Sequence, residues 1–407
     1  MEEKERDECN ALAISDQMFY NKSAMNPLER LRLLDAPLEQ DGAPRACPTR
    51  TRPEGLPIHQ AAVGGRRVPI LKTLLTSACE RDCAYCPFRA GRNFRRVTFR
   101  PDELVETIQA LYRKGTIRGV LLSSGLAGGG RATQDRLLTT AHLLRQHGYR
   151  GYLHLKLMPG IEKDQVLEAL RLADRVSINL EAPSARHLSR LAPHKWFWRE
   201  LLQPLQWAAE LRRSLDPRDY GRNRWPSLVT QFVVGAAQER DRDLLALTAR
   251  LLRETNLARA YFSPFRPIAD TPLAHHPPSP RERAHNLYRA FFLLRDYGFA
   301  LEELVWDAGG NLPPEDPKKL WAEVHLRAQP VELNTAPRAL LLRIPGIGPR
   351  RAEVLLRARR TARLRTSRQL QALGLPVTRM APYILLDGRR LPRQAELFAS
   401  KTAPLSA

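Results

Sequence analysis

Residues 79–86 read Cys79-Glu80-Arg81-Asp82-Cys83-Ala84-Tyr85-Cys86, a C-x3-C-x2-C arrangement directly after a predicted buried strand. Three thiols within eight residues can converge on one face of a metal ion or an iron–sulfur cluster. Zinc usually takes four ligands, and no second cysteine pair or histidine pair follows at the spacing it prefers. Three cysteines leave one iron of a 4Fe–4S cube without a protein ligand, open to a substrate or cofactor. A zinc site completed by a remote residue and three unrelated thiols are the alternatives.

Strand and helix patterns alternate on the C-terminal side of this motif. Six strands are predicted at residues 69–76, 118–123, 151–157, 175–180, 228–234 and 259–263. Helical periodicity is seen at residues 101–114, 133–147, 163–173, 197–211 and 241–254, and again at 281–297. This alternation predicts a parallel α/β domain rather than a β-sandwich. Periodicity alone leaves an open sheet and a barrel as alternatives.

The rest of the chain divides by composition. Residues 1–68 are expected to be an irregular lead-in with one helix near 27–34, and residues 69–308 to form the α/β domain with a trailing helix. A linker at 309–330, a small helical domain at 331–390 and a tail at 391–407 are expected to follow. Residues 331–407 hold 15 basic and 4 acidic residues, which is half of the net charge of +22. Such an asymmetry indicates a nucleic-acid-binding module.

The expected location is a reducing cytoplasm, without a membrane. The acidic start of the chain is unlike a signal peptide, and no apolar run reaches the length of a membrane span. Five cysteines in 407 residues do not make a disulfide framework. Beyond the motif, Cys9 and Cys47 are expected to be free thiols, with a role of Cys47 as a fourth cluster ligand as the alternative.

The cysteine motif, with Tyr85 before its third cysteine, resembles the signature of the radical S-adenosylmethionine (SAM) superfamily. The resemblance implies a partial (β/α)6 barrel. It implies that Cys79, Cys83 and Cys86 hold a 4Fe–4S cluster, that SAM binds the open iron, and that an external electron donor starts cleavage of SAM to a 5′-deoxyadenosyl radical. It identifies no further catalytic residue.

The same resemblance places SAM contacts at the ends of the following strands. The expected contacts are Ser123, Ser124 and Gly125 at the exit of the second strand, which lacks an acidic residue, and Lys156, which points inward from the third strand. Asn179 and Glu181 on the fourth strand, Gly235 at the turn after the fifth strand, and Tyr85 complete the set. Solvated strand positions and a snorkelling lysine are the alternatives.

The basic region holds Pro345-Gly346-Ile347-Gly348 between two short helical patterns, with Asn334 or Thr335 as the expected cap of the first. It resembles a helix-hairpin-helix motif, which binds the DNA backbone without sequence preference. The resemblance, together with the amides at a helix N-terminus, assigns phosphate contacts to Gly346, Ile347, Gly348, Arg350 and Arg351. Residues 368–386 resemble a degenerate second unit. An α-hairpin used only for protein packing is the alternative.

A radical SAM domain followed by this tail resembles one family, whose members are assigned to DNA modification or repair and associated with a partner of the uracil-DNA glycosylase type. The resemblance runs from about residue 65 to 390. It departs at the N-terminus, where Ile58, His59 and Val68 stand in place of expected cysteines. Two other hypotheses remain: a radical SAM enzyme that modifies RNA, and a DNA-binding scaffold whose cluster is structural and recruits a repair partner.

Overall fold

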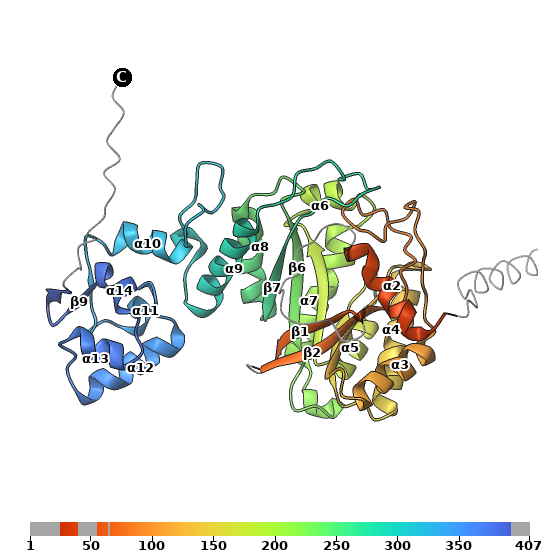
Figure 1. Ribbon diagram of the computed structural model, residues 1–407, viewed down its shortest axis with the longest axis horizontal. Coiled ribbons are helices and arrows are strands. Elements are labelled where there is room, and N and C mark those ends of the chain that lie inside the picture. The colour runs from red at the N-terminus through yellow and green to blue at the C-terminus, as the bar shows by residue number, and fades with distance from the viewer. Residues whose placement is uncertain (1–24, 40–54, 64–65, 392–407) are drawn as a thin grey trace, which may run out of the picture. The chain divides into compact units, whose positions relative to one another are not determined.

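The computed structural model describes residues 25–39, 55–63 and 66–391. The chain divides between Ala284 and His285 into two compact units, which are described separately (Figure 1). Cys9 and Cys47 lie outside the described residues. Within the described part, no helix is both long and apolar enough to cross a membrane.

The first unit is built on a curled sheet of seven strands, which follow one another across the sheet in sequence order (Figure 1). The first pair is antiparallel, and every later pair is parallel. This confirms the α/β half-barrel and the six predicted strands. The strands are β1 (Ile58–Val63), β2 (Arg66–Leu74), β3 (Gly119–Ser123), β4 (Tyr152–Lys156), β5 (Arg175–Glu181), β6 (Ser227–Val234) and β7 (Arg259–Pro264).

β1 corrects the expectation that residues 1–68 contain only one helix. It pairs antiparallel with β2 from Ile58↔Leu71 to Val63↔Arg66 and forms one edge of the sheet. The prolines upstream favoured an irregular assignment, and the segment has no alternation of polar and apolar residues. The available signal was the Gly64-Gly65 pair between the two strands, which is typical of a two-residue hairpin loop.

Helices connect the parallel strands and pack side by side along the chain. Their apolar residues recur at helical spacing: in α3, Leu104, Val105, Ile108 and Leu111 are buried and the intervening positions are polar. The helices are α3 (Pro101–Arg113), α4 (Gly129–Gln146), α5 (Lys163–Leu172), α6 (Ala185–Leu191), the π-helix Phe197–Leu202 that runs into α7 (Gln203–Ser214), and α8 (Asp241–Thr255). α2 (Pro27–Glu39) contacts α3 and β2, and a 3-10 turn lies at Pro217–Tyr220.

The two faces of the sheet differ in chemistry. On β4, Leu153 and Leu155 are fully buried, whereas His154 and Lys156 alternate with them and point to the other face. On β5, Ser177 and Asn179 pair in register with the residues of β6 and belong to that same polar face. The half-barrel therefore has an apolar outer face and a polar inner face.

The second unit follows α9 (Arg281–Asp296), which begins just before the division. It holds α10 (Pro317–His325) within the stretch expected to be a linker, then α11 (Arg338–Leu341), α12 (Pro349–Thr361), α13 (Ser367–Ala372) and α14 (Val377–Met380). 3-10 turns lie at Leu301–Glu303 and Ala381–Tyr383. A small sheet in the order β10-β9-β8 joins β8 (Val331–Glu332), β9 (Ile384–Leu386) and β10 (Arg389–Arg390).

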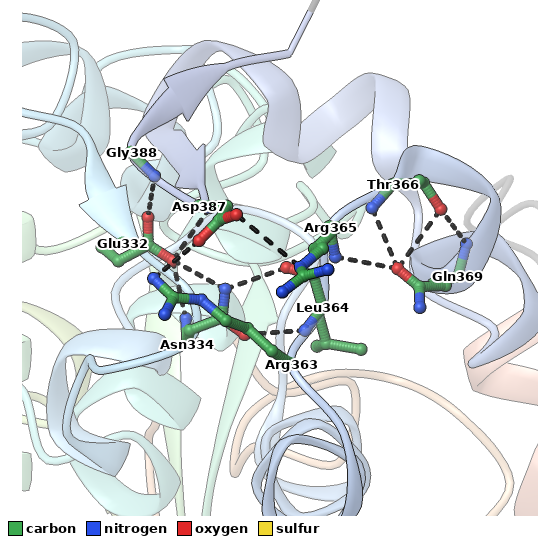
Figure 2. Close-up of polar contacts among 9 residues, drawn as sticks. All are labelled: Glu332, Asn334, Arg363, Leu364, Arg365, Thr366, Gln369, Asp387 and Gly388. Atoms are coloured by element: carbon green, nitrogen blue, oxygen red, sulfur yellow. Dashed lines mark hydrogen bonds and ion pairs between the residues drawn. The ribbon is translucent and has the colours of Figure 1, made fainter.

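A polar network ties the small sheet to the loop between α12 and α13 (Figure 2). The Glu332 carboxylate accepts hydrogen bonds from the backbone amides of Asn334, Asp387 and Gly388. Burial acts to raise the pKa of Glu332, but these hydrogen bonds hold it below its ordinary value. The Asn334 side chain bridges to Leu364, accepting from its N–H and donating to its C=O at 2.9 Å each.

This bridge corrects the expected helix start. Neither Asn334 nor Thr335 caps α11, which begins at Arg338 after Pro337 and has no side-chain cap. Because the amide of Asn334 is engaged by Leu364, it is not available to cap a helix.

Candidate active site and candidate phosphate-binding turn

The cysteine loop lies at the carboxyl end of β2, between this strand and α3. Its backbone is joined to the exit of β3: the Gly125 N–H donates to the Thr76 carbonyl at 2.7 Å, and the Glu80 N–H to the Leu126 carbonyl at 2.7 Å. A Cβ atom on Gly125 would lie 2.2 Å from the Ala78 carbonyl oxygen. Gly125 is therefore required for close packing against the loop, in addition to any contact with SAM.

Arg96 holds the two ends of the loop together. Its guanidinium donates to the carbonyls of Ser77 at 2.8 Å, Phe88 at 2.9 Å and Arg89 at 2.8 Å, one before and two after the cysteines. It also stacks over the Phe94 ring at 4.2 Å. Five donors in a rigid plane suit Arg96 to organise backbone carbonyls in this way.

The three cysteines are free thiols within mutual electrostatic range. Burial raises the pKa of Cys86 to about 12, and burial likewise raises that of Cys83. Thiols with such pKa values need a cationic ligand to become thiolates, which a bound metal centre supplies. No three His, Cys, Asp or Glu side chains in the described part of the chain converge on a position for one metal ion.

Lys195 reaches the cysteine loop from the segment after α6. Its ammonium interacts electrostatically with the Cys83 thiol and lies 6.0 Å from the centre of the Tyr85 ring. Next to it, His194 Nδ1 lies 2.7 Å from an oxygen of Asp82. Sequence reasoning missed Lys195, because nothing in the spacing links it to a motif more than 100 residues away.

A row of polar side chains crosses the inner face from β4 to β5. The Lys156 ammonium donates to the Asn179 side-chain oxygen, and Asn179 Nδ2 donates to Glu181 Oε1 at 3.2 Å. Burial lowers the pKa of Lys156 to about 8, although the Glu181 carboxylate acts in the opposite direction. The structure thus brings together three residues that were predicted separately. Their hydrogen bonds to one another rule out the alternative that they are unconnected side chains exposed to solvent.

Glu181 also connects this row to the cysteine loop. The Tyr85 phenol lies within electrostatic range of the Glu181 carboxylate, and burial together with this negative charge raises the pKa of Tyr85 well above its ordinary value. Glu181 is 4% exposed and has a φ of 64°, which non-glycine residues adopt rarely. Its backbone lies at an irregularity in the β5–β6 pairing. Such strain at a strand end is often found at functional sites.

Two buried polar atoms near this site lack a hydrogen-bond partner: Glu181 Oε2 and Ser124 Oγ. Leaving a buried polar group unsatisfied costs roughly 1–3 kcal/mol. A ligand with an ammonium and hydroxyl groups would satisfy both, and SAM has these groups. The polar inner face therefore fits SAM, as the cysteine loop fits the cluster. Ser123, 9% exposed, lies beside them, and its carbonyl accepts from the Leu75 N–H.

Gly235 lies at the turn after β6, and its contacts are separate from the row of polar residues that includes Glu181. It has a φ of 97°, and its N–H donates to Glu239 Oε1 at 2.5 Å. Glu239 is in turn paired with Arg283, which also binds Asp241 at 2.7 Å. These contacts build a rigid turn, and a role of Gly235 toward adenine stays a prediction.

In the second unit, Gly346, Ile347 and Gly348 form the turn between α11 and α12. Gly346 has a φ of 90°, and a Cβ on it would lie 2.6 Å from Pro376 Cγ. Ile347 is fully buried, and Gly348 caps α12. The first-turn amides of such a helix have no intrahelical acceptor and point outward.

Arg350 and Arg351 follow in the first turn of α12 and are exposed. Arg351 also donates to the Gly346 carbonyl at 2.9 Å, which places its charge over the turn. Ala352 is fully buried, as expected of a small residue between close helices. The structure therefore brings all five predicted residues to one turn.

The second turn, Leu373–Pro376, joins α13 and α14 and packs against the first through Pro376. Gly374 has a φ of 73°, and Leu375 is buried, so the local shape repeats that of the first turn. Pro376 stands where the first turn has Gly348 and provides no backbone donor. The two turns form one compact structure, and Gly348 gives the first a backbone donor at the position where the second has none.

Comparison with known proteins identifies the domain. Residues 73–215 match the profile of the Radical SAM superfamily. No curated protein matches the chain. Residues 73–215 therefore form a radical SAM domain, the type of enzyme domain that uses a 4Fe–4S cluster and SAM. The superfamily resemblance of the cysteine motif is confirmed, and the reaction is not specified by the match.

Several solved structures share similarity at low identity. The FeFe-hydrogenase maturase HydG from Carboxydothermus hydrogenoformans is 13% identical, with a TM-score of 0.43 and coverage of 56% of this chain and 51% of that one. Methylornithine synthase (PylB) is 14% identical, with a TM-score of 0.43 and coverage of 69% and 70%. The radical SAM methyltransferase TsrM from Kitasatospora setae is 14% identical, with a TM-score of 0.39 and coverage of 50% and 38%. The chain spans about half the length of HydG, and similarity at this level does not transfer a substrate.

Proposed function

We propose that this radical SAM enzyme acts on DNA, in modification or repair, and that its C-terminal unit is a helix-hairpin-helix domain that binds the DNA backbone. The observation that supports this most directly is the turn Gly346–Gly348, which presents helix N-terminal amides beside two exposed arginines. Backbone amides and arginines at a helix N-terminus favour phosphate. A net charge of +22 favours a polyanionic partner.

Different residues of the first unit would bind the cluster, bind SAM and hold the cysteine loop closed. Cys79, Cys83 and Cys86 would hold the cluster, and the residues around Glu181 would hold SAM. Together the bound cofactors supply hydrogen-atom abstraction from the substrate. Lys156 would donate through Asn179 toward the SAM side, and Arg96 would keep the loop closed. A base inside a duplex would have to leave the stack to reach this face.

The test uses the full chain and a short fluorescein-labelled duplex. Anisotropy is measured as salt rises from ~50 to ~200 mM, over which phosphate binding loses affinity steeply. Arg350→Ala should reduce the magnitude of the logarithmic salt slope by about 1, as expected for one lost phosphate contact. Arg360→Ala is the matched control, because Arg360 is exposed near the other end of α12.

Two results would overturn the proposal. The first is a flat salt dependence of the unaltered protein, and the second is an equal slope for both variants. Displacement of the duplex by unlabelled tRNA at lower concentration than by unlabelled DNA would transfer the proposal to RNA. An electron donor and a glycosylase-type partner belong to the same proposal, and co-purification with the full chain would test the latter.

A further inference from the structure

Two tryptophans are exposed beside the cysteine loop. Trp196 and Trp198 expose 70% and 57% of their surfaces. In the described part of the chain, the other exposed large apolar side chains are Val324 at 63% and Val354 at 36%. Single exposed apolar residues are ordinary, but two neighbouring indoles exposed to this extent are typical of a binding surface.

The segment that carries this tryptophan pair is held firmly. Glu200 forms an ion pair with Arg81 at 2.6 Å and accepts the Trp196 N–H at 2.7 Å. The Leu191 carbonyl, just before the segment, accepts the Ala84 N–H at 2.7 Å. Residues Phe197–Leu202 form a π-helix, a geometry that occurs frequently at functional sites. The indoles are therefore presented on a fixed support rather than on a mobile loop.

The support is also the segment that touches the cluster ligands. Trp196 directly follows Lys195, which interacts electrostatically with Cys83, and His194 contacts Asp82 within the cysteine motif. A molecule stacked on the tryptophan pair would thus lie next to the loop that holds the cluster. This is where a substrate should be positioned in a radical SAM domain.

The charges around the pair indicate the occupant. Arg199 is exposed on the same segment, where Glu200 is already engaged by Arg81 and Lys195 is turned toward Cys83. An exposed arginine beside the indoles favours a ligand with phosphate groups over an apolar protein face. Aromatic platforms next to basic side chains are the arrangement by which proteins bind unpaired nucleotides.

We propose that Trp196 and Trp198 form a stacking platform for unpaired nucleobases at the mouth of the radical site. This rests on the proposed function and specifies its substrate class: bases that are extrahelical or in single-stranded DNA. The C-terminal unit would then bind the duplex, and the tryptophan pair would bind the base that has left it. Removing a base from the stack is cheapest where it is already unpaired.

The experiment compares two probes on the full chain: a plain duplex, and the same duplex with a central unpaired loop. The unaltered protein should bind the looped probe at least about tenfold more tightly, a difference of about 1.4 kcal/mol. The double variant Trp196→Ala/Trp198→Ala should lose this preference and keep its affinity for the plain duplex. The matched control Trp196→Phe/Trp198→Phe should keep most of the preference, because phenylalanine also stacks.

The outcomes separate the two proposals. Binding of plain duplex without preference for the loop, or a preference that the alanine pair leaves intact, overturns the platform and leaves DNA binding by the tail in place. Failure to bind either probe overturns the proposed function itself. Sedimentation that shows a dimer abolished by the alanine pair would assign the tryptophans to self-association and would also overturn the platform.

Discussion

Arg96 donates a hydrogen bond to the carbonyl of Ser77 at 2.8 Å, so a residue ten positions after the last cysteine is fixed to one just before the first. The same guanidinium holds Phe88 on the far side of the motif. The loop that presents the three thiols is therefore closed by a side chain that need not itself touch the cluster.

Arg96→Ala should consequently lower the amount of cluster that the protein retains. The loop carbonyls lose charge-assisted hydrogen bonds of roughly 1.5–3 kcal/mol each, and the thiols lose their fixed spacing. Arg95→Ala is the matched control, because Arg95 is exposed. Iron and sulfide content after anaerobic reconstitution, with the absorbance of the cluster, measures the effect. Equal loading of the two variants would show that the loop closes without Arg96.

Gly125→Ala should destabilise the first unit by roughly 2–4 kcal/mol, because the new Cβ would lie 2.2 Å from the Ala78 carbonyl oxygen. Backbone cannot move aside as a flexible side chain would. Gly148→Ala provides the comparison. The φ of Gly148 is 77° and a Cβ there would have no atom within 4 Å, so only the strained backbone conformation should lower the free energy of unfolding, by about 1 kcal/mol. Thermal unfolding of both variants checks the order. A Gly125→Ala melting temperature at or above that of Gly148→Ala would contradict the packing argument.

Arg283→Met should cost about 3–5 kcal/mol, since it leaves Glu239 and Asp241 buried without their common partner. Both carboxylates are almost fully inaccessible, with side-chain exposures of 0% and 1%. Arg281→Met is the control, because Arg281 is exposed on the same helix. Urea denaturation measures the difference. Equal denaturation midpoints for the two variants would mean that other groups stabilise the two buried carboxylates when Arg283 is absent.

The sequence was sufficient for those features that depend on local pattern. The cysteine motif and six of the seven strands have short-range signatures, since the cysteines are close in the chain and the parallel strands are either apolar runs or alternate apolar with polar residues. β1 was missed because an edge strand such as Ile58–Val63 needs no apolar run on both faces. Its pairing with β2 is what makes it a strand.

The candidate site was predicted in part for the same reason. Asn179 and Glu181 could be found because alternate residues of a strand share a face. Lys195, Arg96 and the tryptophan pair could not, because their importance lies in contacts between segments far apart in the chain. No periodicity encodes that Lys195 will meet Cys83, or that Asn334 will bind Leu364 rather than cap a helix.

Lys318 makes the stability of the second unit depend on pH. It is 8% exposed, donates to the Ile347 carbonyl in the turn Gly346–Gly348, and lies 4.5 Å from the centre of the Tyr297 ring. Burial lowers its pKa from 10.5 to about 7. Below pH 7 Lys318 is protonated in both the folded and the unfolded chain, so burying its charge lowers the free energy of unfolding by the full amount. Above pH 7 the unfolded chain binds more protons than the folded chain, so the free energy of unfolding should rise by up to about 1.4 kcal/mol per pH unit until about pH 10.

Urea denaturation across this range should show the rise in the unaltered protein and in the exposed-site control Lys319→Met. Lys318→Met should flatten it, and parallel profiles for all three proteins would assign the pH dependence to other groups.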